Sequence, residues 1–326
     1  MPSTADTQPE DSFAIAVEIG GRGQRVALAT EDGRILDSIE SISIDTSALA
    51  TIEVVCRLID QVLARRRNPT SVPAGIGIAF GGPVDTDRGT TIRSHRIGGF
   101  EQYPLVGVLE ERFGLRTVIE NDARAAAVGE YTFGAGRGAR DMVYLHLGHG
   151  VGGGIILGGR LQHGSSMTSG ELGHMVVAAE GPRCSCGKPG HLEAYASAPA
   201  IVARMHARLV EAPEERAQTW VNNGDITPRL IFEHYETDDD AQFIVDETLQ
   251  VIGLAAANLV TALNPDAVVI GGYVVESGSM ITSTVRAKIR QYAFDAAARR
   301  VTVAASDLGS DAALIGASVL VMQDRP

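Results

Sequence analysis

The segment VYLHLGHGVGGGIILGGRLQ, residues 143–162, contains two apolar runs joined by a turn made largely of glycine. Apolar runs on both sides of such a turn predict a β-hairpin. A second segment of this kind, FAIAVEIGGRGQRVALAT, occupies residues 13–30. Each hairpin leads into a related tight turn, DGRI at 32–35 in the first and GGRL at 158–161 in the second. We therefore expect a loose internal repeat, with one glycine hairpin in each half of the chain.

Strands and helices alternate along the rest of the sequence. Further strands are expected at 34–41, 75–80, 117–120 and 267–272, and helices at 51–66, 105–113, 122–131, 238–263 and 312–322. The acidic run at 238–240 should cap the long helix, and Asn264-Pro265 should end it. Such alternation predicts an α/β protein whose helices cover its sheets. Since no Pro/Ser-rich linker separates the halves, we expect two closely packed domains with a cleft between them, the usual place for a ligand.

Composition excludes several classes of protein. The chain has 326 residues, of which 44% are hydrophobic and 21% charged, and this excludes a disordered chain. Its net charge of −12 disfavours nucleic-acid partners. No apolar run approaches the roughly 20 residues that span a bilayer, and the polar residues 1–12, expected to be a disordered tail, show no signal peptide. We therefore expect a cytoplasmic protein without a membrane partner, in a reducing compartment that suits its three cysteines.

The glycine turns are candidate phosphate sites. Around Gly148–Gly154, backbone N–H groups can approach a ligand without interference from Cβ atoms, and phosphate oxygens are the usual ligand of such a nest. The alternative is that they are only turns. They match neither a Walker A loop nor a dinucleotide-binding fingerprint, because no GK[ST] follows them and no helix opens after them.

The segment ENDA, residues 120–123, joins an expected strand to an expected helix. A carboxylate at the C-terminal end of a strand points toward the crevice where α/β proteins bind ligands. The alternative is structural, because Asn and Asp are also favoured as helix N-caps. From these residues alone, both interpretations of Asn121 and Asp122 stay open.

The most informative region is 163–197. Cys184, Cys186 and His191 lie within eight residues on a glycine-rich knuckle, and their thiolate and imidazole ligands suit a tetrahedral zinc ion. His174, ten residues before Cys184, can supply a fourth ligand. The alternative is a reduced turn with incidental cysteines.

This region also carries a family resemblance. GVGGG at 150–154, Gly164 and GELGH at 170–174 together resemble the signature of the ROK family, which comprises bacterial sugar kinases, sugar-responsive repressors and open reading frames of unknown role. The similarity covers nearly the whole chain. It includes the glycine–proline turn at 77–85, residues 120–122, the CxCG knuckle with Leu192-Glu193, and the segments 264–272 and 311–317.

The resemblance implies an actin-like ATPase fold, with two ribonuclease-H-like α/β domains, ATP and a sugar in the interdomain cleft, and a homodimer. By this resemblance the smaller domain comprises 13–121 and 310–326, and the larger domain, with the zinc knuckle, comprises 122–309.

By motif, Asp122 corresponds to the catalytic base that takes the proton from the attacking sugar hydroxyl. The sugar-binding residues implied are Gly82, Asn121, Asp122, Glu171, His174 and Glu193. The residues implied to bind ATP and Mg²⁺ are Glu18, Gly20, Gly21, Arg22, His149, Gly150, Gly152, Gly271 and Gly272. The implied zinc ligands are His174, Cys184, Cys186 and His191, with Zn²⁺ fixing the sugar-binding loop.

The chain departs from the usual family pattern at three places. Kinases of the family usually read D-x-G-G-T-K at the first hairpin, where this chain reads EIGGRG at 18–23. The common G-T-G of the second hairpin is GHG at 148–150, a replacement seen in the repressor branch. His191 stands in place of the third knuckle cysteine and remains a competent zinc ligand.

The leading hypothesis is a glucokinase-like, ATP-dependent kinase of a hexose or N-acetylhexosamine with atypical phosphate loops. The alternative is a regulatory sugar-binding protein with weak or no kinase activity, and it rests on Arg22, Gly23 and His149. A DNA-binding repressor is a third hypothesis, but the residues before Phe13 are too few for the family's helix-turn-helix. The particular sugar, and the choice between ATP and polyphosphate as phosphoryl donor, stay open.

Overall fold

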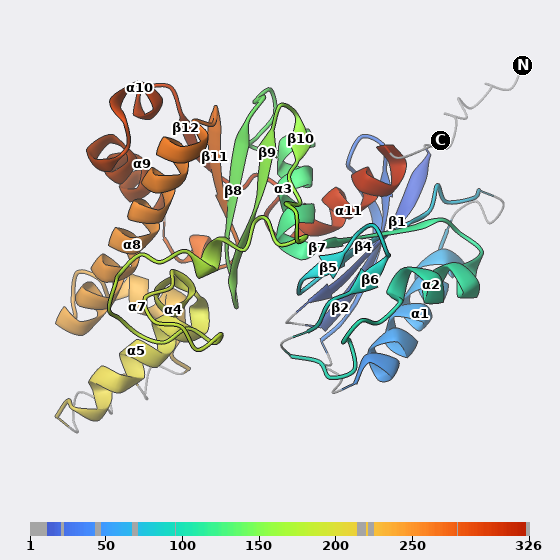
Figure 1. Ribbon diagram of the computed structural model, residues 1–326. Coiled ribbons are helices and arrows are strands. Elements are labelled where there is room, and N and C mark those ends of the chain that lie inside the picture. The colour runs from blue at the N-terminus through green and yellow to red at the C-terminus, as the bar shows by residue number, and fades with distance from the viewer. Residues whose placement is uncertain are drawn as a thin grey trace, which may run out of the picture. The chain divides into compact units, whose positions relative to one another are not determined.

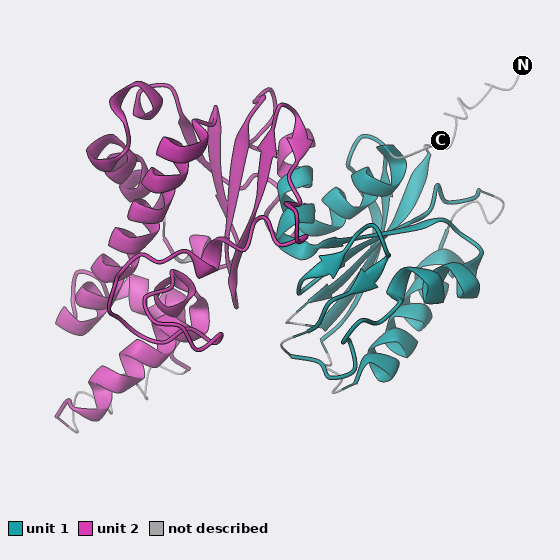
Figure 2. Ribbon diagram, in the orientation of Figure 1, with its two compact units in different colours: residues 1–129, 311–326 teal, residues 130–310 magenta. Residues whose placement is uncertain are grey.

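The computed structural model describes residues 12–20, 23–42, 47–66, 71–94, 96–213, 220, 225–278 and 280–323. The predicted tail, 1–12, lies outside these residues except for Ser12. The chain forms two compact units, which we describe separately: unit 1 comprises 1–129 and 311–326, and unit 2 comprises 130–310 (Figure 2).

Unit 1 is built on a mixed sheet of order β3-β2-β1-β4-β7 (Figure 1). Its strands are β1 (Phe13–Gly20), β2 (Gly23–Thr30), β3 (Ile35–Ser41), β4 (Ile76–Phe80) and β7 (Thr117–Asn121). Strands β1, β2 and β3 form an antiparallel meander, whereas β4 and β7 continue the sheet parallel to β1. The other elements are α1 (Ala48–Ala64), α2 (Leu105–Phe113), α11 (Ala312–Gln323), most of α3 (Asp122–Thr132), and a two-stranded ladder of β5 (Val84–Asp85) and β6 (Thr90–Thr91).

The two faces of this sheet carry side chains of different size. Because successive residues of a strand point to opposite faces, Ile15, Val17 and Ile19 of β1 share one face, where they form a core with apolar residues of α1 and α2. On the opposite face Ala16 packs with Leu314 of α11. The small side chain allows this helix to lie directly against the strands.

Unit 2 repeats the same topology. Its sheet has the order β10-β9-β8-β11-β12, with β8, β9 and β10 antiparallel and with β11 and β12 parallel to β8. The strands are β8 (Met142–Leu147), β9 (Val151–Leu157), β10 (Arg160–Leu161), β11 (Ala267–Gly271) and β12 (Thr302–Ala305). The β1–β2 hairpin of unit 1 therefore corresponds to the β8–β9 hairpin of unit 2, and the predicted internal repeat is confirmed.

The long predicted helix forms the core of unit 2. Helix α8 (Asp239–Leu263) is capped at its N-terminus by Asp238, whose side chain accepts hydrogen bonds from Asp240 N and Ala241 N. Its C-terminal cap is Asn264. By length and composition alone, α8 could cross a membrane. However, 67% of its most apolar 18-residue segment is buried inside the protein, which is typical of a core helix. Among its described residues unit 2 also contains α4 (Glu193–Ala196), α5 (Ala198–Val210), α7 (Pro228–Glu233), α9 (Met280–Tyr292), α10 (Asp295–Ala298) and the 3₁₀ turns η1 (Leu172–His174) and η2 (Val275–Ser277).

The boundary between the units falls inside α3, after Gly129. From the sequence, the boundary is expected before Asp122. The difference arises because α3 and α11 cross very closely: a Cβ atom at Gly316 would overlap the carbonyl oxygen of Ala125, and one at Gly129 would overlap that of Ala312. This contact keeps the first two turns of α3 with unit 1.

Candidate active site and metal cluster

In unit 1, Glu18 lies near the end of β1, just before the first glycine turn. Its carboxylate pairs with Arg25 at 3.3 Å, and Arg25 pairs in turn with Asp311 at 2.5 Å. Burial acts to lower the pKa of Arg25, but the hydrogen bond to Asp311 and the charge of Glu18 raise it above its usual value. Gly20 follows Glu18 directly, whereas Gly21 and Arg22 lie outside the described residues.

Asn121 and Asp122 occupy the corner between β7 and α3. Asn121 caps the helix, because its Oδ1 accepts from Ala123 N and Arg124 N, both at 3.1 Å. Its Nδ2 donates to the carbonyl of Gly82 at 3.2 Å and to Oδ1 of Asp122 at 3.1 Å. The structure therefore brings the predicted residues Gly82, Asn121 and Asp122 together within unit 1.

Asp122 has two distinguishable carboxylate oxygens. Oδ1 accepts from Ala123 N at 2.8 Å. Oδ2 is directed toward Gly81, and a Cβ atom added to Gly81 would lie 3.4 Å from this oxygen. Below this corner, Glu120 and Arg124 form an ion pair at 2.7 Å with side chains only 3% and 2% exposed. Because Asn121 supplies most of the helix cap, Asp122 can present an oxygen to a ligand from a rigid support.

In unit 2, the second glycine turn, 148–150, connects β8 to β9, and its Gly148 N donates to Gly150 O at 2.9 Å. Gly152 and Gly271 flank His146 in register, one on each neighbouring strand. The loop that begins at Gly272 returns to β8, since Val274 N donates to Leu147 O at 3.1 Å. The structure thus brings the glycines of unit 2 that were predicted to bind nucleotide together, on adjacent strands and on the loops that follow them.

His149 projects from this turn against an aromatic ring. The ring centroids of His149 and Tyr273 are 5.2 Å apart. Tyr273 is not among the predicted site residues, although it directly follows the predicted Gly271 and Gly272. The two ring planes are inclined at 51°, so the imidazole of His149 packs against Tyr273 without stacking on it.

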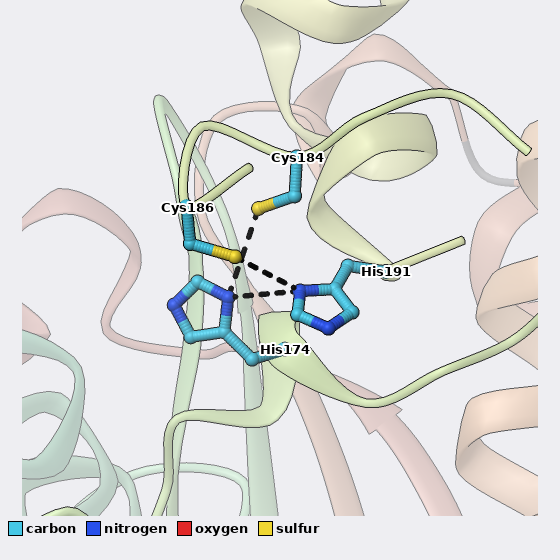
Figure 3. Close-up of side chains that lie close together, drawn as sticks. All are labelled: His174, Cys184, Cys186 and His191. Carbon is cyan, nitrogen blue, oxygen red and sulfur yellow. Dashed lines mark hydrogen bonds between the residues drawn. The ribbon is translucent and has the colours of Figure 1, made fainter. Parts of the chain in front are cut away.

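Glu171 and His174 lie at the two ends of η1, which follows the loop after β10. Oε2 of Glu171 is 3.8 Å from Nε2 of His174, and both side chains are about one-third exposed, at 38% and 34%. The other ring nitrogen of His174, Nδ1, points toward the cysteine knuckle (Figure 3).

Four side chains converge at this knuckle, as Figure 3 shows: His174, Cys184, Cys186 and His191. One ligand atom from each lies within 4.8 Å of all the others. The Nδ1 atoms of the two histidines are 3.3 Å apart, Cys184 Sγ is 3.7 Å from His174 Nδ1, and Cys186 Sγ is 3.3 Å from His191 Nδ1. A zinc ion about 2.0 Å from nitrogen and about 2.3 Å from sulfur holds tetrahedral ligands roughly 3.3–3.8 Å apart. The three distances lie in this range, so the four residues are a candidate zinc site.

The protonation states of the knuckle also bear on metal binding. Burial is the main cause that raises the pKa of the Cys184 thiol to about 11, so without a metal this group stays protonated at neutral pH. Burial, with a smaller contribution from His174, lowers the pKa of His191 and favours its neutral, metal-binding form.

Glu193 begins α4 and contacts both the knuckle and the glycine turn. Its Oε1 accepts from Ser185 Oγ at 2.8 Å and from Cys184 Sγ at 3.3 Å, and its Oε2 accepts from Val151 N at 3.2 Å. Burial acts to raise the pKa of Glu193, but these hydrogen bonds, led by that from Ser185, hold it below its usual value. Glu193 is therefore an ionised acceptor in a fixed orientation.

The predicted residues thus fall into two groups. Unit 1 contains Gly82, Asn121, Asp122, Glu18 and Gly20; unit 2 contains Glu171, His174, Glu193, the knuckle and the second glycine turn. Sequence reasoning missed Arg25 and Ser185. No local signal marks Arg25, whose partner Asp311 is 286 residues away, whereas the position of Ser185 between two candidate ligands could have drawn attention to it.

Comparison with known proteins identifies relatives over almost the full length. Residues 14–324 match the ROK family. The chain is 35% identical over 320 residues to a glucokinase of Halalkalibacterium halodurans, covering 97% of this chain and 96% of that relative. It is 30% identical to an N-acetylmannosamine kinase of Escherichia fergusonii, covering 95% of this chain and 99% of that one.

A solved structure shows the same architecture. The ROK family glucokinase from Streptomyces griseus, in complex with glucose and AMPPNP, is 32% identical and superposes with a TM-score of 0.81, covering 96% of this chain and 100% of that chain. The predicted α/β fold of the actin-like ATPase type, with its duplicated domain, is confirmed. From the matched length, the shared fold and the relatives together, the chain belongs to the ROK family.

Proposed function

We propose that this protein is an ATP-dependent kinase that phosphorylates a hydroxyl group of a hexose or N-acetylhexosamine. The observation that carries the proposal is the β7–α3 corner, where Asn121 caps the helix and fixes Asp122 beside Gly81 and Gly82. Relatives named glucokinase and N-acetylmannosamine kinase support the same reaction class.

In the proposed reaction, Asp122 accepts the proton of the sugar hydroxyl while the hydroxyl oxygen attacks the γ-phosphorus of ATP. The new O–P bond forms as the bond to the β–γ bridging oxygen breaks, and ADP leaves with that electron pair. Such a base contributes about 10²–10⁴-fold in rate. Mg²⁺ bound to the nucleotide supplies charge neutralisation, and backbone N–H groups of the glycine turns bind phosphate oxygens.

Each unit supplies its own share of the proposed ligands. In unit 1, Glu18, held by Arg25, gives an acidic group for the Mg²⁺–phosphate region, and Asn121 and Gly82 bind sugar hydroxyls together with Asp122. In unit 2, Glu171, His174 and Glu193 bind further hydroxyls, and the glycines at 150, 152, 271 and 272 bind the nucleotide. Several acceptors suit a polyol, because each buried hydroxyl needs a partner.

We also propose that the knuckle binds one Zn²⁺ through His174, Cys184, Cys186 and His191. With four protein ligands the site is closed, so it has a structural role. Because Nδ1 of His174 faces the knuckle, its Nε2 remains on the side of Glu171, where we propose that it binds a sugar hydroxyl. We further propose that the protein acts in the cytoplasm as a homodimer, without nucleic-acid or membrane partners.

One observation favours a second candidate function, a regulatory sugar-binding protein with weak or no kinase activity. The His149 ring, in contact with the inclined ring of Tyr273, stands on the turn that would bind phosphate. Arg22, which also departs from the family pattern, lies outside the described residues. The rate of sugar-dependent ADP release separates the two functions, since the regulatory protein turns over weakly or not at all.

The decisive experiment compares the wild type with Asp122→Asn in coupled ADP release over a panel of hexoses and N-acetylhexosamines. Asparagine keeps an acceptor for Ala123 N but cannot accept the proton. We expect kcat to fall about 10²–10⁴-fold, with sugar affinity changed less than about tenfold. Turnover within about tenfold of the wild type would show that Asp122 is only a helix cap.

A further inference from the structure

A single carboxylate connects the knuckle to the glycine turn in unit 2. Oε1 of Glu193 accepts from Ser185, which lies between the two cysteines, and Oε2 accepts from the backbone N–H of Val151, the first residue after the turn. One rigid group therefore contacts both a candidate metal site and a candidate phosphate site.

The same short segment holds the other end of the turn. Ala198 N, at the start of α5 and two residues after the end of α4, donates to the carbonyl of Gly148 at 2.9 Å. The space between these anchors is tight, since a Cβ atom at Gly150 would lie 3.0 Å from Oε2 of Glu193. A displacement of Glu193 would therefore change the orientation of the backbone N–H groups at 148–151.

The hydroxyl of Ser185 is the donor that persists when the knuckle holds a metal. Cys184 also donates to Oε1 of Glu193, at 3.3 Å, but a metal-bound sulfur is a thiolate without a proton to donate. Ser185 itself is exposed and contributes no metal ligand. Its orientation depends on the backbone between Cys184 and Cys186, which metal binding would hold.

We propose that Glu193 is a positioning residue that, through Ser185, couples metal occupancy of the knuckle to the affinity of the Gly148–Gly150 turn for nucleotide phosphates. This inference rests on the proposed function. It adds that the knuckle controls nucleotide binding as well as sugar binding. Removing the metal frees the 184–186 loop and loosens the Ser185–Glu193 hydrogen bond, even though the Cys184 thiol can again donate to Glu193, and it lets the Val151 amide fluctuate.

The test uses the full chain as wild type, Ser185→Ala and the control Ser166→Ala, which removes another exposed, hydrogen-bonded serine of unit 2. Each protein is measured zinc-loaded and after chelation. Calorimetry with ATP–Mg²⁺ gives nucleotide affinity, and hydrogen exchange measures protection of the Val151 amide.

In the wild type and in Ser166→Ala, we expect chelation to weaken ATP binding at least about fivefold and to speed exchange at Val151. Zinc-loaded Ser185→Ala should already show the weaker binding and faster exchange, and chelation should then change its affinity less than about twofold.

Full zinc dependence retained in Ser185→Ala, or exchange at Val151 unaffected by either change, would overturn the inference while leaving the proposed function intact. If the zinc-loaded wild type bound no ATP, the proposed function would fail and the coupling to nucleotide would fail with it. The exchange measurement would then still show whether Glu193 links the knuckle to the turn.

Discussion

Gln24, the second residue of β2, offers a sharp test of the packing in unit 1. Its side chain is fully buried, and neither Nε2 nor Oε1 has a hydrogen-bond partner within the part of the chain that the structure describes. By strand alternation it shares a face with Val26 and Leu28, which belong to the apolar core. A buried amide without partners loses its hydration without compensation.

The expected size of the effect follows from this loss. An unsatisfied buried polar group costs about 1–3 kcal/mol. Methionine has the same unbranched length as glutamine and needs no hydrogen bond. Gln24→Met should therefore raise the free energy of unfolding by about 1–3 kcal/mol. Since about 1 kcal/mol shifts the melting temperature of a domain this large by roughly 2–4 °C, the melting temperature should rise by about 2–12 °C.

Urea denaturation and thermal melting, followed by circular dichroism, measure this change. The matched variant Gln24→Glu should lose stability, by several kcal/mol if the group stays ionised, because it buries a carboxylate at the same site. A Gln24→Met protein less stable than the wild type by more than about 1 kcal/mol would refute the reasoning, because the amide must then have a partner such as a buried water.

Three further predictions concern the metal, the contact between α3 and α11, and pH. Purified protein should contain one zinc per chain by metal analysis, and the double variant Cys184→Ser, Cys186→Ser should lose the zinc and bind sugar more weakly; a zinc-free wild type of unchanged stability would contradict this. Gly316→Ala should destabilise unit 1 by more than about 2 kcal/mol in urea denaturation, since the added Cβ overlaps the Ala125 carbonyl oxygen. Hydrogen bonds from the backbone amides of Asp141 and Arg140 lower the pKa of Asp266. Its contribution to stability is therefore present above the unfolded pKa of about 3.9 and lost as pH falls through the folded pKa. The stability difference between the wild type and Asp266→Ala should accordingly be largest near pH 7 and shrink at pH 3.

Local patterns in the sequence predicted much of the fold. The glycine hairpins, the helix at 105–113 and the capped helix ending at Asn264 were predicted to within a few residues, because turns, periodicity and caps depend on neighbouring residues. The spacing of Cys184, Cys186 and His191 likewise predicted a compact knuckle, since a short loop leaves few ways to separate its side chains.

Other elements were not predicted, for differing reasons. Strand β12 is only four residues long and is stabilised by pairing with β11, so no local sequence pattern predicts it. Helix α5 was missed although Ile201, Met205 and Leu209 recur at helical spacing and are buried. The spacing of these apolar residues was sufficient to predict α5, whereas no local pattern was sufficient to predict β12.

The roles of the polar residues depended on contacts between distant parts of the chain. The sequence left open whether Asn121 and Asp122 face a ligand or cap the helix, and only the packed β7–α3 corner shows that Asn121 supplies most of the cap. The pairing of Arg25 with Asp311 and the bridge from Glu193 to Val151 join residues 286 and 42 positions apart. Turns and hydrophobic periodicity depend on residues that are close in the chain, and they can therefore be predicted from the sequence. An ion pair or a bridging carboxylate forms only after folding of the sheets has brought its partners within about 3 Å of each other.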